Sequence, residues 1–254
     1  MALLEIKNIS KSFGGIKAIV DFSLEANKGE IHGIIGPNGA GKTTIFNTIS
    51  GVYQADKGNV ILDGEDITNL PQYKITHKGI GRTFQNIRIF KGLSILDNVL
   101  CAFDPKSKYT VFGSLFPTPA RIREEKRGRE LALSYLEVVG MADKKDERPE
   151  NLSYGNQRKI EIARALMCEP KVLLLDEPAA GLTPTEVGEL TDLIKKISSE
   201  FGFAILLIEH RLDLVMSISD LIHVQNFGET IAVGTAEEVQ HNKAVIEAYL
   251  GAEE

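Results

Sequence analysis

The stretch EIHGIIGPNGAGKTTIFNTISGV, residues 30–52, contains the pattern that decides the fold. Its first part, EIHGIIG, is a short apolar run typical of a strand, and it leads directly into a glycine-rich turn. Its last part, TTIFNTISGV, has helical character, with Gly51 placed to end the helix. The turn between them matches G-x-x-x-x-G-K-[ST], so the stretch predicts a strand, a phosphate-binding loop and a helix in succession.

The glycines of this loop allow the backbone to wrap closely around phosphate oxygens with its N–H groups pointing inward. The helix that follows adds its positive N-terminal end. Lys42 is expected to reach the β- and γ-phosphates of a nucleoside triphosphate, and the Thr43 hydroxyl to ligate Mg²⁺. The predicted nucleotide-binding residues of the loop are Gly36, Pro37, Asn38, Gly39, Ala40, Gly41, Lys42, Thr43 and Thr44.

Two acidic residues end the apolar run KVLLLDEP, residues 171–178. A continuous apolar run is typical of a buried parallel strand. At the C-terminal edge of such a strand, Asp176 can hold Mg²⁺ and Glu177 can orient an attacking water as a base. An acidic pair in an ordinary turn is the alternative for these residues taken alone, and the phosphate-binding loop favours the metal and catalytic roles.

Strands alternate with helices along most of the chain. FAILLIEH, residues 203–210, is a second continuous apolar run, and LLEIKNISKSF, residues 3–13, alternates as a half-buried strand does. Thr183 begins a helix with a capping box, and Thr235 repeats that box before one last helix over residues 236–250. The pattern predicts an α/β fold: a P-loop ATPase core with a mostly parallel sheet and an N-terminal antiparallel β region.

A helical subdomain is expected within this core. Residues 94–167 read as helical, with an interruption at residues 104–119 and the charge run RIREEKRGRE at residues 121–130, typical of a solvated helix face. We therefore expect one domain overall, with an ATP-binding core of residues 1–93 and 168–254 and a helical subdomain of residues 94–167.

The composition is that of a globular protein, with 254 residues, 43% of them hydrophobic and 25% charged. The net charge of −6 argues against a nucleic-acid-binding protein. Two cysteines, Cys101 and Cys168, form neither a disulfide framework nor a zinc motif, and we expect reduced thiols that are mostly in the core. Because no leader peptide or membrane-length apolar run is recognisable, we expect a cytoplasmic protein that reaches a membrane only through another chain.

A second helix start also looks suited to an anion. In NLSYGNQRKIEIARAL, residues 151–166, Ser153 can cap a helix beginning at Asn156, and Gly155 leaves the backbone open to close approach. Together with the phosphate-binding loop and LLLDEP, this order of motifs resembles the ABC-type ATPases, whose motif L-S-G-G-Q has a variant in LSYGN. The resemblance implies a head-to-tail dimer that sandwiches ATP, with Ser153 and Gly155 of one subunit covering the γ-phosphate held by another.

The resemblance also implies roles for single residues. Phe13 would stack on adenine, Gln85 would sense Mg²⁺ and join the core to the helical subdomain, and His210 would contact the γ-phosphate. The implied catalytic residues are Glu177, His210 and Lys42, and the implied metal ligands are Thr43, Gln85 and Asp176. Three positions depart from the family pattern and bear on communication between the two sites: Tyr154, Asn156 and Thr183.

A closer similarity is to the LivG-like ATPase subunits of branched-chain amino-acid importers, carried by GIGRTFQNIRIFKGLSILDNVL at residues 79–100, DEPAAGL and IEHRLDLVMSISD. It implies import driven by ATP hydrolysis, a second ABC ATPase subunit in a homo- or heterodimer, transmembrane permease subunits, and indirectly a periplasmic or extracellular solute-binding protein. The chain would then lie on the inner face of the cell membrane. The alternatives are an exporter ATPase such as a lipopolysaccharide-extraction subunit, a soluble ABC ATPase of DNA repair or translation, and a P-loop kinase.

Overall fold

The computed structural model describes residues 2–103 and 118–250, and the chain divides into two compact units. We call Met1–Gln85 with Pro170–Glu254 the sheet unit, and Asn86–Glu169 the helical unit. The chain crosses between them after Gln85 and after Glu169, where the sequence suggested crossings after residues 93 and 167. Most of the expected interruption, residues 104–117, lies outside the described residues.

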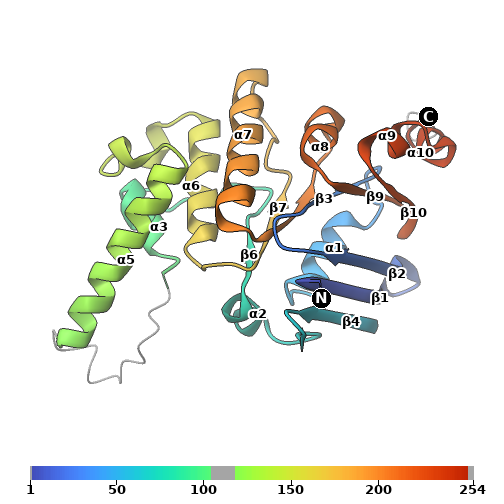
Figure 1. Ribbon diagram of the computed structural model, residues 1–254, viewed down its shortest axis with the longest axis horizontal. Helices are drawn as coiled ribbons and strands as arrows, with labels where there is room; N and C mark the ends of the chain where they lie inside the picture. Colours follow the sequence, from blue (N-terminus) through green and yellow to red (C-terminus); the bar gives the residue numbers. More distant parts are fainter. Residues whose placement is uncertain (1, 104–117, 251–254) are drawn as a thin grey trace. The chain divides into compact units, whose positions relative to one another are not determined.

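The larger sheet of the sheet unit is mostly parallel, as predicted (Figure 1). β3 pairs in parallel with β8 and β9, and β7 pairs in parallel with β8 and β6, whereas β10 is antiparallel to β9. Every residue of β3, β7 and β8 is buried, which explains their continuous apolar sequences. The strands, in their order across the sheet, are β10 (Glu229–Gly234), β9 (Leu221–Asn226), β3 (Ile31–Ile35), β8 (Ala204–Ile208), β7 (Val172–Asp176) and β6 (Ile80–Arg82).

The smaller sheet is antiparallel and lies at the N-terminus, again as predicted. Its strands, in order, are β2 (Ile16–Ala26), β1 (Leu4–Phe13), β4 (Lys57–Leu62) and β5 (Glu65–Asp66). The alternation of β1 is interrupted at Asn8, whose φ of +50° marks a shift in register. One face of this sheet belongs to the apolar core, through Leu4, Ile6 and Phe22 among others.

Helix α1 connects the two sheets, because it contacts both β2 and β7. It follows the phosphate-binding loop, and its apolar side chains Ile45, Phe46 and Ile49 are fully buried in the same core. The helices of the sheet unit are α1 (Lys42–Ile49), α2 (Gln72–Lys78), α7 (Pro184–Phe201), α8 (Leu212–Ile218), α9 (Ala236–Gln240) and α10 (Lys243–Leu250).

The prediction of one last helix over residues 236–250 is wrong. The Thr235 capping box begins α9 as expected, but α9 ends at Gln240 and a separate α10 begins at Lys243. The side chain of Asn242 accepts hydrogen bonds from the N–H groups of Ala244 and Val245. Asparagine is favoured at the N-terminal cap of a helix and disfavoured in a helix interior. Asn242 therefore begins a new helix and does not continue α9.

The helical unit packs three helices against one another: α3 (Ile95–Leu100), α5 (Pro119–Val138) and α6 (Tyr154–Leu166). Two short 3-10 helices, Ala142–Lys144 and Pro149–Asn151, connect α5 to α6. α6 starts at Tyr154, slightly before the expected Asn156. Of the helices in the described ranges, α5 included, none is both long and apolar enough to cross a bilayer.

The cysteines only partly follow expectation. Both are free thiols, but Cys101 is exposed and Cys168 is half-buried. Cys101 is the C-cap residue of the short helix α3, and so lies just beyond the helix. The expectation of a core position is therefore wrong for Cys101.

Two histidines lie stacked inside the sheet unit. His32 of β3 and His223 of β9 have ring centroids 5.6 Å apart, and His32 Nδ1 lies 3.3 Å from His223 Nε2. His32 Nε2 lies 3.1 Å from Glu30 Oε2. Burial, with a smaller contribution from His32, lowers the pKa of His223 to about 3. His223 is therefore neutral in the folded protein at ordinary pH.

Acidification should destabilise the sheet unit through His223. In the unfolded chain this side chain binds a proton near its ordinary pKa of about 6.5, whereas in the folded protein it does so only near 3. Above the unfolded-state pKa, proton binding by His223 does not reduce the free energy of unfolding. As the pH falls below that pKa, the free energy of unfolding decreases, because the unfolded chain binds a proton at His223 and the folded protein does not. Between about pH 7.5 and about pH 5, the wild type should lose about 2 kcal/mol more free energy of unfolding than His223→Leu.

Urea unfolding at the two pH values measures this difference, with His241→Gln, a change at an exposed histidine, as the control. Equal pH dependence in the wild type and in His223→Leu would contradict the assignment.

Candidate functional site

Three parallel strands of the larger sheet end at one edge. Ile34 of β3 pairs with Ile208 of β8, and Ile208 pairs in turn with Asp176 of β7. The residues that follow these strands therefore leave the sheet side by side. In order across the sheet they are the loop from Gly36 after β3, the segment containing His210 after β8, and Glu177 after β7. Carboxyl ends of parallel strands are where open α/β sheets bind ligands.

The loop between β3 and α1 needs its glycines. A Cβ on Gly36 would lie 2.0 Å from the carbonyl oxygen of Gln225, and one on Gly41 would lie 2.1 Å from that of Ala18. Gly36, Gly39 and Gly41 also have positive φ angles. α1 begins at Lys42 with no side-chain hydrogen bond at its N-cap, so the N–H groups of its first turn are suited to an anion.

Lys42 is buried beneath this loop. Its Nζ donates to the carbonyl oxygens of Gly36, at 2.7 Å, and Pro37, at 2.9 Å. Burial lowers the pKa of Lys42, and the nearby carboxylates of Glu177 and Asp176 oppose that shift. The ammonium group thus sits within a partly desolvated, acidic neighbourhood in which its interaction with phosphate is stronger than in water.

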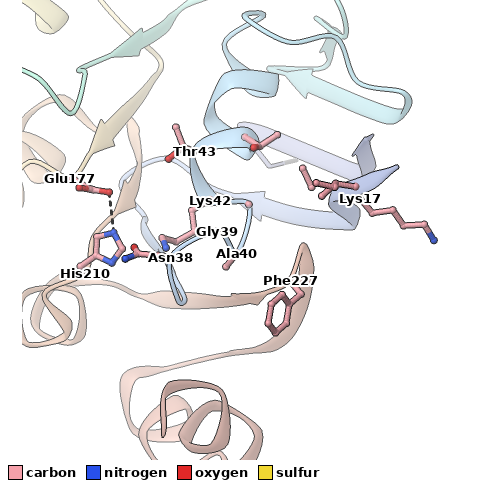
Figure 2. Close-up of a pocket in the computed structure, with 13 residues that line it drawn as sticks. Lys17, Asn38, Gly39, Ala40, Lys42, Thr43, Glu177, His210 and Phe227 are labelled. Atoms are coloured by element: carbon pink, nitrogen blue, oxygen red, sulfur yellow. Dashed lines mark hydrogen bonds and ion pairs between the residues drawn. The ribbon is translucent and has the colours of Figure 1, made fainter. Parts of the chain in front are cut away.

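The carboxylate of Glu177 is held from two sides. Gln85 Nε2 donates to Glu177 Oε2 at 2.7 Å. Figure 2 shows the second contact, in which His210 Nε2 lies 3.0 Å from Glu177 Oε1. The backbone of Glu177 has a φ of +46°, a conformation that is uncommon outside glycine and often marks functional sites. The structure thus brings together three predicted residues from three separate segments.

Asp176 has a partner that the sequence analysis missed. Arg82, the last residue of β6, places Nη2 2.8 Å from Asp176 Oδ2, and both side chains are at most 8% exposed. Arg82 Nη1 also donates to Asn47 and Ser50, each at 2.8 Å. The one feature of the sequence that could have indicated this pair is a basic residue, Arg82, at the end of a short strand. A cation buried there requires an anion nearby.

A pocket of about 440 Å³ lies over the phosphate-binding loop (Figure 2). It is lined by Ile16, Lys17, Ala18, Asn38, Gly39, Ala40, Gly41, Lys42, Thr43, Thr44, Glu177, His210 and Phe227. Phe227 is unexpected: it lies in the turn between β9 and β10, is 86% exposed and has a φ of +46°. Nothing in its local sequence pointed to the loop.

Phe13, by contrast, is not among the residues that line this pocket. It ends β1, is 43% exposed, and its ring packs edge-on against Tyr53 with centroids 5.0 Å apart. The ammonium group of Lys11 lies 5.4 Å from the same ring centroid. The structure therefore places Phe13 outside the pocket itself.

Ser153 and Gly155 belong to the helical unit. Ser153 Oγ accepts a hydrogen bond from the N–H of Asn156 at 3.4 Å, so the predicted N-cap of α6 is present. Ser153 and Tyr154 are exposed, and Gly155 is buried. In the sheet unit, Thr183 caps α7 with a complete capping box, as predicted.

A protein-only metal cage is absent from the described residues: no three or more His, Cys, Asp or Glu side chains cluster in a way that could hold an ion. Of the predicted Mg²⁺ ligands, only Asp176 is a carboxylate, whereas Thr43 and Gln85 offer neutral oxygens. Thr43 is exposed in the pocket, whereas Asp176 is 3% exposed. This set fits an ion that takes few protein ligands and completes its shell with phosphate oxygens and water, as Mg²⁺ does.

Comparison with known proteins finds that this chain is similar to ATP-binding proteins of transport systems. The family described as ABC transporter matches residues 19–180, and the family described as branched-chain amino acid ATP-binding cassette transporter matches residues 229–254. The chain is 45% identical to the high-affinity branched-chain amino acid transport ATP-binding protein BraF of Pseudomonas aeruginosa and 41% identical to LivG of Escherichia coli, each over 98% of both chains. It is 33% identical to the lipopolysaccharide export system ATP-binding protein LptB of Haemophilus influenzae, over 99% of this chain and 98% of LptB.

Solved structures agree with these relatives. The chain superposes on the ADP conformation of an ATP-binding cassette of an ABC transporter with a TM-score of 0.86 and 36% identity, over 99% of both chains. It also matches a dimeric, post-hydrolysis ATP-binding cassette bound to ADP and Pi, with a TM-score of 0.74 and 25% identity, over 92% of this chain and 98% of that one.

Removing Arg82 should strongly destabilise the sheet unit. Arg82→Met leaves the buried Asp176 carboxylate without its cation and should lower the free energy of unfolding by about 3–5 kcal/mol. Lys78→Met, which breaks an exposed ion pair with Glu65, should cost less than about 1 kcal/mol. Adding Asp176→Asn to Arg82→Met should recover part of the loss. Urea unfolding measures the wild type, the two single variants and the double variant. Equal losses of free energy of unfolding in Arg82→Met and Lys78→Met would contradict the interpretation.

Proposed function

The chain belongs to the ABC transporter family, and we propose that it is the ATP-hydrolysing subunit that energises import of branched-chain amino acids. ATP hydrolysis is the activity of the family and of this chain. The transported solute is the proposed part. It is supported by the match of residues 229–254 and by the names of the relatives at 41–45% identity.

The phosphate-binding loop would hold the triphosphate. The N–H groups at the start of α1 and of the loop before it provide the donors, and Lys42 would turn from the carbonyl oxygens of Gly36 and Pro37 to the β- and γ-phosphates. The base of the nucleotide would lie toward Ile16, with Phe13 as the proposed stacking partner. Adenine is therefore expected on the exposed face of Phe13, just beyond the pocket.

Glu177 would orient the attacking water. The water oxygen forms a bond to the γ-phosphorus, the bond from that phosphorus to the bridging oxygen of ADP breaks, and Glu177 accepts the proton that the water loses. His210 and Gln85 hold the two carboxylate oxygens of Glu177, and His210 would also contact the γ-phosphate. Most of the catalysis then comes from positioning and from charge stabilisation.

Mg²⁺ would be held by Thr43, Gln85 and Asp176, and it would neutralise charge that develops on the phosphate oxygens. Arg82 holds the Asp176 carboxylate at the end of β7 through their ion pair. Gln85 is the last residue of the sheet unit before the chain enters the helical unit. This position in the chain suits a residue proposed to transmit the state of the bound nucleotide to the helical unit.

Two subunits would complete each site. We propose that Ser153 and Gly155 of one subunit cover the γ-phosphate held by the other, in a homo- or heterodimer that docks on transmembrane permease subunits at the inner face of the cell membrane. The exposure of Ser153, and the dimeric ADP- and Pi-bound cassette that this chain resembles, support the proposal. A solute-binding protein would then act indirectly, through the permease.

Glu177→Gln should separate binding from hydrolysis. The amide keeps the shape of the side chain but cannot accept the proton, so phosphate release should fall at least about 100-fold while ATP affinity stays within about threefold. Phosphate release and equilibrium nucleotide binding measure the two quantities. Wild-type turnover in this variant would refute the role of Glu177.

Reconstitution tests the proposed solute. The chain, purified with the membrane subunits that bind it and placed in vesicles, should support ATP-dependent uptake of leucine, isoleucine or valine when a solute-binding protein is added. Lys42→Ala should abolish uptake without preventing assembly. Co-purification with lipopolysaccharide-extracting membrane proteins, and no amino-acid uptake, would favour the exporter reading instead.

A further inference from the structure

Glu209 is a buried acid beside the site to which no role is assigned above. It follows β8 and directly precedes His210, and it is only 2% exposed. A carboxylate is rarely buried so completely unless it is paired or hydrogen-bonded. Its hydrogen bonds therefore indicate what keeps it there.

Three backbone N–H groups donate to this carboxylate. The N–H of Ala179 donates to Glu209 Oε1 at 2.6 Å, and the N–H groups of His210 and Arg211 donate to Oε2 at 3.0 Å and 3.3 Å. Ala179 lies in the segment after β7, whereas His210 and Arg211 lie in the segment after β8. One carboxylate thus ties together the two segments that carry the proposed base and its histidine.

The backbone of Glu177 is fixed by the same region. Its N–H donates to the carbonyl oxygen of Ile208 at 2.9 Å, and its carbonyl oxygen accepts from the N–H of Ala180 at 3.1 Å. Glu177 therefore makes a hydrogen bond to the end of β8 and also begins a turn, and the third residue of that turn, Ala179, donates to Glu209. These bonds restrain Glu177 in its left-handed conformation.

The burial of Glu209 is costly. Burial raises the pKa of Glu209, the three backbone hydrogen bonds oppose that shift, and the like charge of Glu177 adds to it. The net direction is upward, so the ionised form is less stable here than in water. An acid kept under such conditions beside a reaction centre is more typical of function than of stability alone.

We propose that Glu209 is a positioning residue for ATP hydrolysis, which sets the placement of the Glu177 carboxylate relative to the His210 imidazole by bridging the segments that carry them. This inference rests on the roles proposed above for Glu177 and His210. The His210–Glu177 distance of 3.0 Å depends on both segments, and an error of about 1 Å in such geometry lowers a rate by about 100-fold.

Glu209→Gln is the most informative change. The amide keeps the size of the side chain, but its oxygen can accept from only one of the two segments, and its NH₂ group then faces an N–H donor of the other. Binding of ATP is expected to depend on the phosphate-binding loop, and the three N–H groups that donate to Glu209 belong to other segments. The variant should therefore lower kcat by about 10- to 100-fold and leave the KM for ATP within about threefold of the wild type.

Asp220, an exposed acid, offers a control for the same loss of charge at the opposite ends of these strands. Its Oδ2 accepts a hydrogen bond from the N–H of Ile31 at 2.8 Å, so it also joins the ends of two strands. Asp220→Asn makes the same carboxylate-to-amide change far from the proposed chemistry. It should leave kcat and KM within about twofold of the wild type.

The experiment measures kcat, KM and thermal unfolding for the full-length wild type, Glu209→Gln, Asp220→Asn and Glu177→Gln. A kcat for Glu209→Gln within threefold of the wild type, or kcat and KM changes no larger than those of Asp220→Asn, would overturn the proposal. If Glu209→Gln does not fold, Glu209→Asp takes its place: it keeps the charge but shortens the reach by one methylene, and a wild-type kcat would again overturn the proposal. An inactive wild type, or a fully active Glu177→Gln, would instead count against the proposed function.

Discussion

The parallel alignment of β3, β8 and β7 is the constraint on which the site depends. Because Ile34, Ile208 and Asp176 lie in one register across the sheet, the three chain segments that follow must leave from the same edge. These strands are buried throughout, and a slip in register would displace every side chain of a fully packed core. The packing of the core therefore fixes the geometry of the phosphate-binding loop, the acids and the histidine.

The charged side chains at this edge are held by charged or polar partners. Asp176 is neutralised by Arg82, Glu177 lies between Gln85 and His210, and Lys42 is partly desolvated beside the two acids. Such an arrangement is polar but fixed, so it can respond to the charge of a triphosphate with little reorganisation. Because the family hydrolyses ATP, we propose that these side chains form the site of phosphoryl transfer to water.

Much of this was predictable from the sequence, because the information was local. The phosphate-binding loop, the buried strands ending at Asp176 and Ile208, and the caps at Ser153 and Thr183 each follow from a short run of residues. The bonds of Arg82 to Asp176 and of Glu209 to Ala179 join distant segments and leave no local pattern. The break between α9 and α10 had a local signal in Asn242, which the regular apolar spacing around it outweighed.

We propose that this edge of the sheet binds the triphosphate, and that the Ser153 segment of a second subunit completes the site. A crystal structure of Glu177→Gln grown with Mg²⁺ and ATP tests it most directly. We expect the phosphates along the N–H groups that open α1, with Ser153 Oγ of a second subunit within about 3.5 Å of a γ-phosphate oxygen. A triphosphate enclosed by one subunit alone, or bound away from this edge, would contradict the account.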